Sequence, residues 1–158
     1  MSLRFHILSA AFLGLSSLSI GAEQPLKFDV PPGWQYSFHQ DNGTFFIAKR
    51  VETDKKGRLP YPSNVTLKRC LPSYDLHNTR GHIDEVASKL QKEAPRDTFT
   101  IAHIGGTSFE GHLVYHKLPW NGLSAMYELS NGKEVWFGMY VGDESDFAIV
   151  LKILKSLH

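Results

Sequence analysis

The side chains best suited to chemistry surround a predicted β-hairpin in the second half of the chain. Gly105-Gly106 predicts a two-residue turn between two segments of alternating apolar and polar residues. Side chains alternate between the two faces of a strand, so His103, Glu110 and His112 would share one face. Two histidines and a carboxylate are a known zinc ligand set and would support a metal-dependent enzyme. The alternative is a solvated polar sheet face. Because ligands this far apart along strands rarely converge on one ion, we predict neither a metal nor another cofactor.

The remaining nucleophiles lack the partners that catalysis requires. Cys70 is the only cysteine among 158 residues, so the chain cannot form an internal disulfide or a four-cysteine zinc site. His77 follows it closely, but no third group that would orient the imidazole can be identified. The run from Gly106 to Glu110 lacks the final glycine of a nucleophile elbow. The sequence therefore predicts a protein that is not an enzyme, with Cys70 either buried and inert or paired with another chain.

Two aromatic residues, Trp136 and Tyr140, are the first candidates for a binding site. The sequence predicts a strand over residues 133–141. A three-residue loop with a bulge at Gly132 would align Phe137 and its odd-numbered neighbours with the apolar face of the preceding strand. Trp136 and Tyr140 would then project from the opposite face. Either a helix covers this face and buries both rings, or the rings are exposed and bind a ligand or another protein.

The second candidate site is a basic segment. Residues 49–69 contain seven basic and two acidic residues. At its centre, Lys55, Lys56 and Arg58 lie in a polar stretch, 52–63, that is predicted to form a loop. Such a charge run either is a solvated edge that discourages sheet-to-sheet pairing or docks an acidic partner. The whole chain has a net charge of only +1, which gives no case for nucleic acid as a partner.

The N-terminal residues predict export. A short basic start precedes an apolar run over residues 7–20 and two small residues, which is the pattern of a secretory signal peptide over residues 1–22. An N-terminal membrane anchor is the alternative, but the run is short for a membrane span and contains four serines. Removal of this segment would leave residues 23–158 as a single domain. We expect that domain to be periplasmic or secreted, without stable membrane insertion.

The rest of the chain predicts an α+β fold. Alternating apolar residues bounded by glycine, proline and asparagine predict strands, and apolar residues at helical spacing predict helices. The predicted strands cover residues 26–30, 34–38, 44–51, 64–70, 98–104, 107–118, 123–129 and 133–141, and the predicted helices cover 83–94 and 143–157. Short turns between successive strands require antiparallel neighbours. We therefore predict an antiparallel β-sheet of about six to seven strands with two main helices packed on it.

Three features of the sequence are shared with one known superfamily. They are the segment Phe28-Asp29-Val30-Pro31-Pro32-Gly33-Trp34, the antiparallel run to Val141, and the closing helix with Ile153-Leu154-Lys155-Ser156-Leu157. In these features the chain resembles the PsbP-like superfamily, which includes an extrinsic photosystem subunit and many small exported bacterial proteins. The resemblance implies an α/β/α sandwich and a non-enzymatic binding or assembly module. It carries over no functional residue and implies no photosynthetic role.

These observations together predict an exported, non-catalytic binding or accessory protein. Its partner is expected to be a protein in the envelope or outside the cell. One alternative is an immunity protein that neutralises a secreted toxin, since such proteins are also small, exported and without active sites. A second alternative is a metal-dependent enzyme that uses the face with His103, Glu110 and His112.

Overall fold

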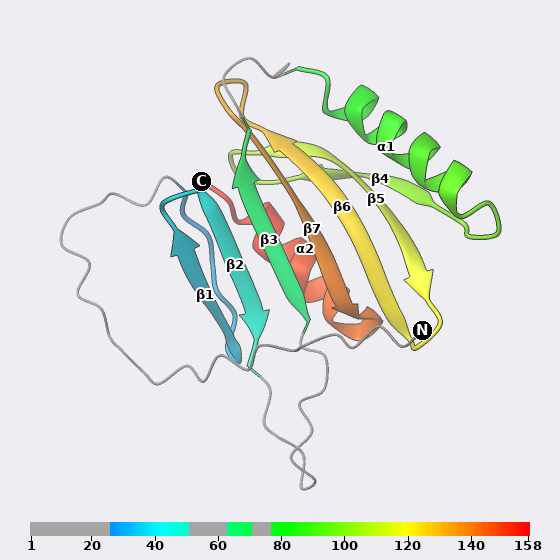
Figure 1. Ribbon diagram of the computed structural model, residues 1–158. Helices are drawn as coiled ribbons and strands as arrows, with labels where there is room; N and C mark the ends of the chain where they lie inside the picture. Colours follow the sequence, from blue (N-terminus) through cyan, green and yellow to red (C-terminus); the bar gives the residue numbers. More distant parts are fainter. Residues whose placement is uncertain (1–25, 51–62, 71–76) are drawn as a thin grey trace, which may run out of the picture.

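The computed structural model describes residues 26–50, 63–70 and 77–158, which form one seven-stranded antiparallel sheet with a helix on each face (Figure 1). The strand order is β1-β2-β3-β7-β6-β5-β4. The strands are β1 (Trp34–His39), β2 (Thr44–Lys49), β3 (Asn64–Arg69), β4 (Thr100–Gly105), β5 (Glu110–Leu118), β6 (Gly122–Ser130) and β7 (Val135–Asp143). The helices are α1 (Thr79–Glu93), the 3-10 turn η1 (Glu144–Asp146) and α2 (Phe147–Lys155). The predicted α+β class is confirmed, whereas the predicted signal peptide lies outside the described residues.

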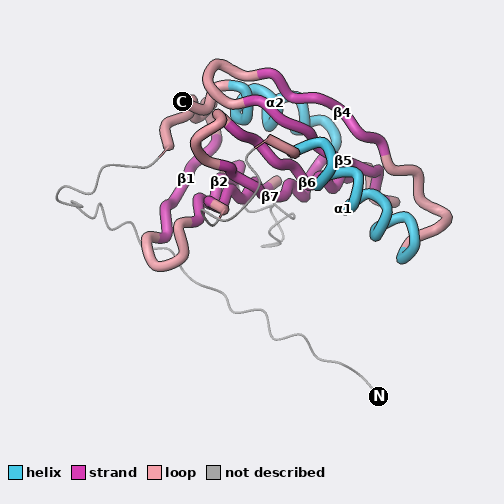
Figure 2. Tube along the Cα trace, turned by 90° about the horizontal axis from the view of Figure 1, so that it is seen from above, coloured by secondary structure: helices cyan, strands magenta, loops and turns pink. Residues whose placement is uncertain are grey.

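The two helices lie on opposite faces of the sheet (Figures 1 and 2). Tyr140 of β7 stacks on Phe147 of α2, with ring centroids 5.7 Å apart. Phe137 projects from the other face of β7, and its cross-strand neighbour Glu128 contacts His82 of α1. We name these the α2 face and the α1 face. The molecule is therefore an α/β/α sandwich.

The hydrophobic core lies between α2 and its face of the sheet. Apolar residues spaced three or four apart place one side of the helix and the residues after it against the strands. These buried residues are Val150, Ile153, Leu154 and Leu157. Full burial of each such side chain contributes about 1.5–3 kcal/mol. In α1, by contrast, the buried residues are Thr79 and Ile83, so polar contacts carry a larger share of its attachment to the sheet.

A glycine makes room for Tyr127, a buried and hydrogen-bonded side chain of this core. Gly138 lies directly opposite Tyr127, and a Cβ at Gly138 would stand only 2.8 Å from the tyrosine ring and 1.8 Å from the carbonyl oxygen of Thr66. The buried tyrosine hydroxyl donates to that carbonyl at 2.6 Å. The close approach of β3 to β7 and the placement of Tyr127 therefore both depend on a residue without a side chain.

The register between β6 and β7 differs from the predicted one. Ser130 pairs with Val135, so the loop contains four residues, 131–134, rather than three. The side-chain oxygen of Asn131 accepts hydrogen bonds from the backbone nitrogens of Lys133 and Glu134, both at 2.9 Å, and stabilises the longer loop. The pairing is displaced by three residues, since Leu129 faces Trp136 rather than Lys133, and an odd displacement moves every side chain of a strand to the other face. Trp136 therefore joins the apolar face of β6, and Phe137 moves to the α1 face.

The hairpin between β4 and β5 also has a longer loop than the predicted Gly105-Gly106 turn. Gly105 pairs with Glu110, which leaves a loop over residues 106–109. This loop is tied to the end of α2, because the backbone nitrogen of Thr107 donates to the carbonyl oxygen of Lys155 at 2.9 Å. The ring of Phe109 is buried in the core and anchors this loop to the domain. His103 therefore pairs with His112 rather than with Ser108, a shift of four residues. Because four is an even number, His103, Glu110 and His112 still lie on one face, as predicted.

The ends of three predicted elements also change. α1 begins at Thr79 rather than residue 83, because the side chain of Asn78 caps it by accepting from the backbone nitrogen of Gly81 at 3.1 Å. Asp143 caps a 3-10 turn that leads into α2. Residues 26–30, predicted as a strand, form an extended segment outside the sheet. Backbone hydrogen bonds join Lys27 to His158 in both directions at 2.9 Å, which brings the C-terminal end beside this segment (Figures 1 and 2).

Candidate functional site

Trp136 and Tyr140, the first predicted binding residues, belong to the core. Both side chains have 0% exposure, and α2 covers them. The Tyr140 hydroxyl donates to the carbonyl oxygen of Asp143 at 2.5 Å, and its oxygen lies 3.2 Å from the Ser63 hydroxyl oxygen. Burial raises the pKa of Tyr140 to about 12. Of the two alternatives, burial under a helix is the one observed, and the role of Trp136 and Tyr140 as binding residues is corrected, because the changed register places both rings beneath α2.

In the described part of the predicted basic segment, some basic side chains form ion pairs within the domain and one does not. Lys49 Nζ contacts both carboxylate oxygens of the buried Asp146, at 2.8 and 3.0 Å, and Arg69 forms an ion pair with Glu134 at 2.8 Å. Lys68 projects from the α1 face, and no carboxylate in the described residues lies within ion-pair distance of it. Lys55, Lys56 and Arg58 lie outside the described residues.

The predicted face with His103, Glu110 and His112 exists, and one of its side chains, His112, attaches α1 to the sheet. His103 and His112 are direct cross-strand neighbours with ring centroids 5.2 Å apart, while Glu110 lies opposite Gly105. His112 Nδ1 contacts the Thr79 hydroxyl of α1 at 3.1 Å. Burial, and then the charge of His103, lower the pKa of His112. In the ranges that the structure covers, no group of three or more histidine, cysteine or acidic side chains is arranged to hold a metal ion.

A second contact of the same kind joins α1 to β6. His82 Nδ1 lies 2.7 Å from the carboxylate of Glu128, whose side chain is buried between the helix and the sheet. The two imidazole contacts therefore attach the N-terminal half of α1 to two neighbouring strands. Sequence reasoning missed this role because residue 82 lies before the predicted start of the helix.

Three large apolar side chains are exposed together on the α1 face, beside the region that the helix covers. The cross-strand rows join Phe46 of β2 to Thr66 of β3 and then to Met139 of β7, and they place Phe137 opposite Lys68. Phe46, Phe137 and Met139 have exposed fractions of 42–43%. We name these three residues the apolar strip. Because α1 contacts β4, β5 and β6, it does not shield this half of the face.

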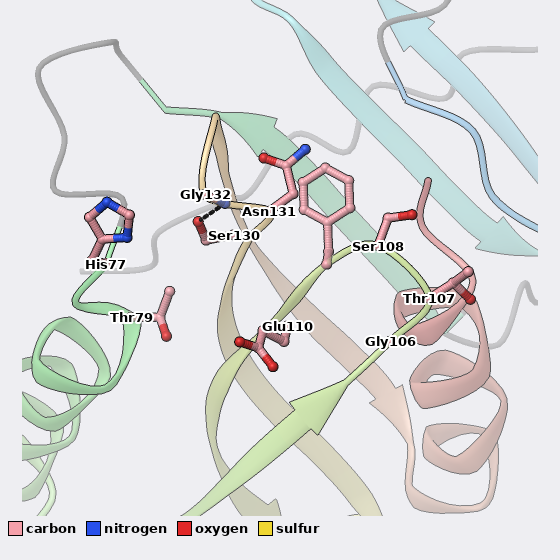
Figure 3. A pocket seen from close by; sticks show the side chains of 10 residues that line it. His77, Thr79, Gly106, Thr107, Ser108, Glu110, Ser130, Asn131 and Gly132 are labelled. Atoms are coloured by element: carbon pink, nitrogen blue, oxygen red, sulfur yellow. Dashed lines mark hydrogen bonds between the residues drawn. The ribbon is translucent and has the colours of Figure 1, made fainter.

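A polar pocket lies at the N-terminal end of α1, where the start of the helix meets the loop after β4 and the loop after β6 (Figure 3). Its volume is about 440 Å³. Its lining comes from the start of α1, the 106–109 loop with the first residue of β5, and the end of β6 with its loop. The lining residues are His77, Thr79, Gly106, Thr107, Ser108, Phe109, Glu110, Ser130, Asn131 and Gly132. Of these, sequence reasoning had proposed only Glu110 as a site residue.

The sequence contained one usable signal for the apolar strip. Both faces of β7 are apolar, with Trp136 and Tyr140 on one and Phe137 and Met139 on the other. Such a strand either has other elements packed on both of its faces or leaves one apolar face exposed. The pocket had no comparable signal, because loop lengths decide which hydroxyl and amide groups meet there.

The fold and these two surfaces define a small α/β/α sandwich protein with an exposed apolar strip and a separate polar pocket. No known family matches the chain, and a search of curated proteins finds no similar sequence. Within the described ranges, neither helix has the length and apolar character needed to cross a membrane.

Proposed function

We propose that the protein is an exported, non-catalytic accessory protein that binds a protein partner through the apolar strip. The observation that carries this proposal is the exposure of Phe137 and Met139 of β7, and of Phe46 two strands away in the same cross-strand row, on one open sheet face. Soluble proteins rarely leave contiguous large apolar side chains in water unless these take part in binding. Aromatic residues and methionine are also enriched at the centres of protein interfaces.

The charge beside the strip indicates the chemistry of the partner. Lys68 lies directly opposite Phe137 and has no ion-pair partner in the described part of the chain. A partner that presents apolar side chains next to a carboxylate would bury the strip and neutralise this ammonium group. The partner is therefore an apolar and acidic protein surface, in the envelope or outside the cell. A secreted toxin is one protein that could present such a surface.

Site-specific photo-crosslinking tests this proposal. A photoreactive phenylalanine analogue replaces Phe137 in one variant and Trp120 in the control. Trp120 is a matched control because it is an exposed aromatic residue, 53% accessible, in the turn between β5 and β6. Incubation with envelope and culture-medium extracts should give an adduct with one defined protein at position 137 and none at position 120. Mass spectrometry of the adduct identifies the partner and distinguishes a toxin from an envelope component.

Binding to the purified partner then measures the contribution of the strip. Phe137→Ser and Lys68→Glu should each raise Kd about tenfold or more, a loss of about 1.4 kcal/mol, whereas Trp120→Ser should leave Kd unchanged. Equal adducts at both positions, or a Kd that does not respond to Phe137→Ser, would show that the strip is not the binding surface.

A further inference from the structure

We propose that the polar pocket at the start of α1 binds a neutral saccharide unit. The pocket is separate from the apolar strip, and its volume of about 440 Å³ lies in the range of small-molecule sites, about 300–1,000 Å³. Its walls come from three segments far apart in the sequence, as Figure 3 shows for Thr79, Ser108 and Asn131.

The pocket presents a strong acceptor that no group of the described residues uses. Glu110 is the first residue of β5, and its carboxylate forms no ion pair or hydrogen bond within the described ranges. The register places Glu110 directly opposite Ser130 of β6, next to Asn131. A carboxylate can accept hydrogen bonds from two neighbouring hydroxyl groups, because it has two oxygens and about four lone-pair sites.

The pocket also presents a positioned donor. The side-chain oxygen of Asn131 accepts from two backbone nitrogens of its own loop, those of Lys133 and Glu134. These two bonds fix which end of the amide is the oxygen, and they leave its NH₂ group to donate. Ser108, in the facing loop, adds a hydroxyl without a hydrogen-bond partner in the described residues, and a hydroxyl both donates and accepts.

This mixture of groups fits a ligand made of hydroxyl groups better than a charged one. Every hydroxyl of a saccharide donates and accepts, so it can pair with the carboxylate of Glu110 and with the amide of Asn131. An anionic ligand would meet the carboxylate at close range. A simple ammonium ligand could pair with the carboxylate of Glu110, but it offers no acceptor to the amide hydrogens of Asn131.

The walls are held in place before a ligand arrives. The backbone nitrogen of Thr107 donates to the carbonyl oxygen of Lys155 at 2.9 Å, and a Cβ on Gly106 would stand 2.9 Å from the same oxygen. On the opposite loop, the backbone nitrogen of Gly132 donates to the Ser130 hydroxyl at 3.0 Å. A site that is already ordered loses little conformational freedom on binding.

Nuclear magnetic resonance titration of the folded protein tests the proposal. The probes are D-glucose, D-galactose, N-acetylglucosamine and their common disaccharides, each to about 10 mM, well above a millimolar Kd. Inorganic phosphate and lysine are the anionic and cationic comparison ligands. At least one saccharide should shift the backbone signals of Ser108, Asn131 and Gly132, and neither comparison ligand should do so.

Matched variants assign the effect to the pocket. Glu110→Gln keeps the size of the side chain but removes its charge and half of its acceptors, and it should weaken saccharide binding roughly tenfold. Glu85→Gln, on the exposed side of α1, should leave it unchanged. Phe137→Ser should also leave it unchanged, which separates this proposal from the one for the apolar strip. Shifts by phosphate or lysine in place of saccharides, no shift by any saccharide, or a Glu110→Gln variant that binds as tightly would each overturn the proposal.

Discussion

Replacing Asp146 by alanine should destabilise the fold measurably, because this carboxylate is the centre of a buried polar network. Its side chain is 6% exposed and accepts hydrogen bonds from Lys49 Nζ, at 2.8 and 3.0 Å, and from the Ser63 hydroxyl, at 2.7 Å. Tyr140 extends the network, because its hydroxyl oxygen lies 3.2 Å from that of Ser63. Asp146 stands where η1 meets α2, so the network fastens the start of that helix to β2 and to Ser63, just before β3.

The expected magnitude follows from the exposure of each partner. A hydrogen bond to a charged group contributes about 1.5–3 kcal/mol. Lys49 is 45% exposed and regains water when the carboxylate is removed, so its share is discounted strongly. Ser63 is buried and loses an acceptor that water does not replace. We expect Asp146→Ala to lower the free energy of unfolding by about 2–3 kcal/mol and Tm by about 6–9 °C, and Asp146→Asn, which keeps an acceptor, by about half as much.

Urea unfolding followed by tryptophan fluorescence and circular dichroism measures these losses. The control is Asp84→Ala, which removes the Arg80–Asp84 ion pair on α1. Its atoms are as close, at 2.9 Å, but its side chains are 57% and 47% exposed. An exposed pair of this kind contributes less than about 0.5 kcal/mol. Equal losses in the Asp146 and Asp84 variants would refute the reasoning that burial sets the value of the contact.

Three further predictions concern packing, pH and reactivity. Gly138→Ala should abolish cooperative thermal unfolding or cost more than about 3 kcal/mol, because the new Cβ would stand 1.8 Å from the Thr66 carbonyl; a native-like Tm contradicts this. Burial, with His103 second, lowers the folded-state pKa of His112, so its contribution to stability is present above the unfolded pKa of about 6.5 and is lost as the pH falls below it. Urea unfolding at a series of pH values should show a smaller acid loss for His112→Gln than for the unchanged protein, and equal losses would contradict the assignment. Partial burial raises the pKa of Cys70 to about 11, so iodoacetamide at pH 8 should alkylate it slowly until urea is added, and a fast native reaction would count against the raised pKa.

The sequence was sufficient to predict which consecutive segments pair across short turns, and insufficient to predict how many residues turn between them or that β3 pairs with β7. Alternation and short turns predicted the antiparallel sheet, and the helical spacing of Val150, Leu154 and Leu157 predicted the helix that covers its core. The loop after β6 has four residues because the side chain of Asn131 accepts from two backbone nitrogens, a choice that residue type alone does not decide. That single residue of difference decides whether Trp136 is in the core or on the opposite face.

The candidate sites follow the same division. His103, Glu110 and His112 were placed correctly on one face, because an error of an even number of residues keeps alternation intact. What these side chains do was not predictable, since it depends on where α1 begins and which strands it crosses. The apolar strip depends on the register of β7, and the pocket depends on two loops that bring Ser108 and Asn131 together only in the folded chain.

The pairing of Lys27 with His158 affects the order in which the molecule can be completed. A chain is synthesised from its N-terminal end. The segment at residues 26–30 therefore emerges early, whereas its backbone partner, His158, emerges 131 positions later. Until residue 158 is available, the segment that contains Leu26 and Phe28 lacks its backbone partner. These two side chains then cannot take their places in the core beside β2. Closure of this part of the core therefore waits until both ends of the described domain are free to pair.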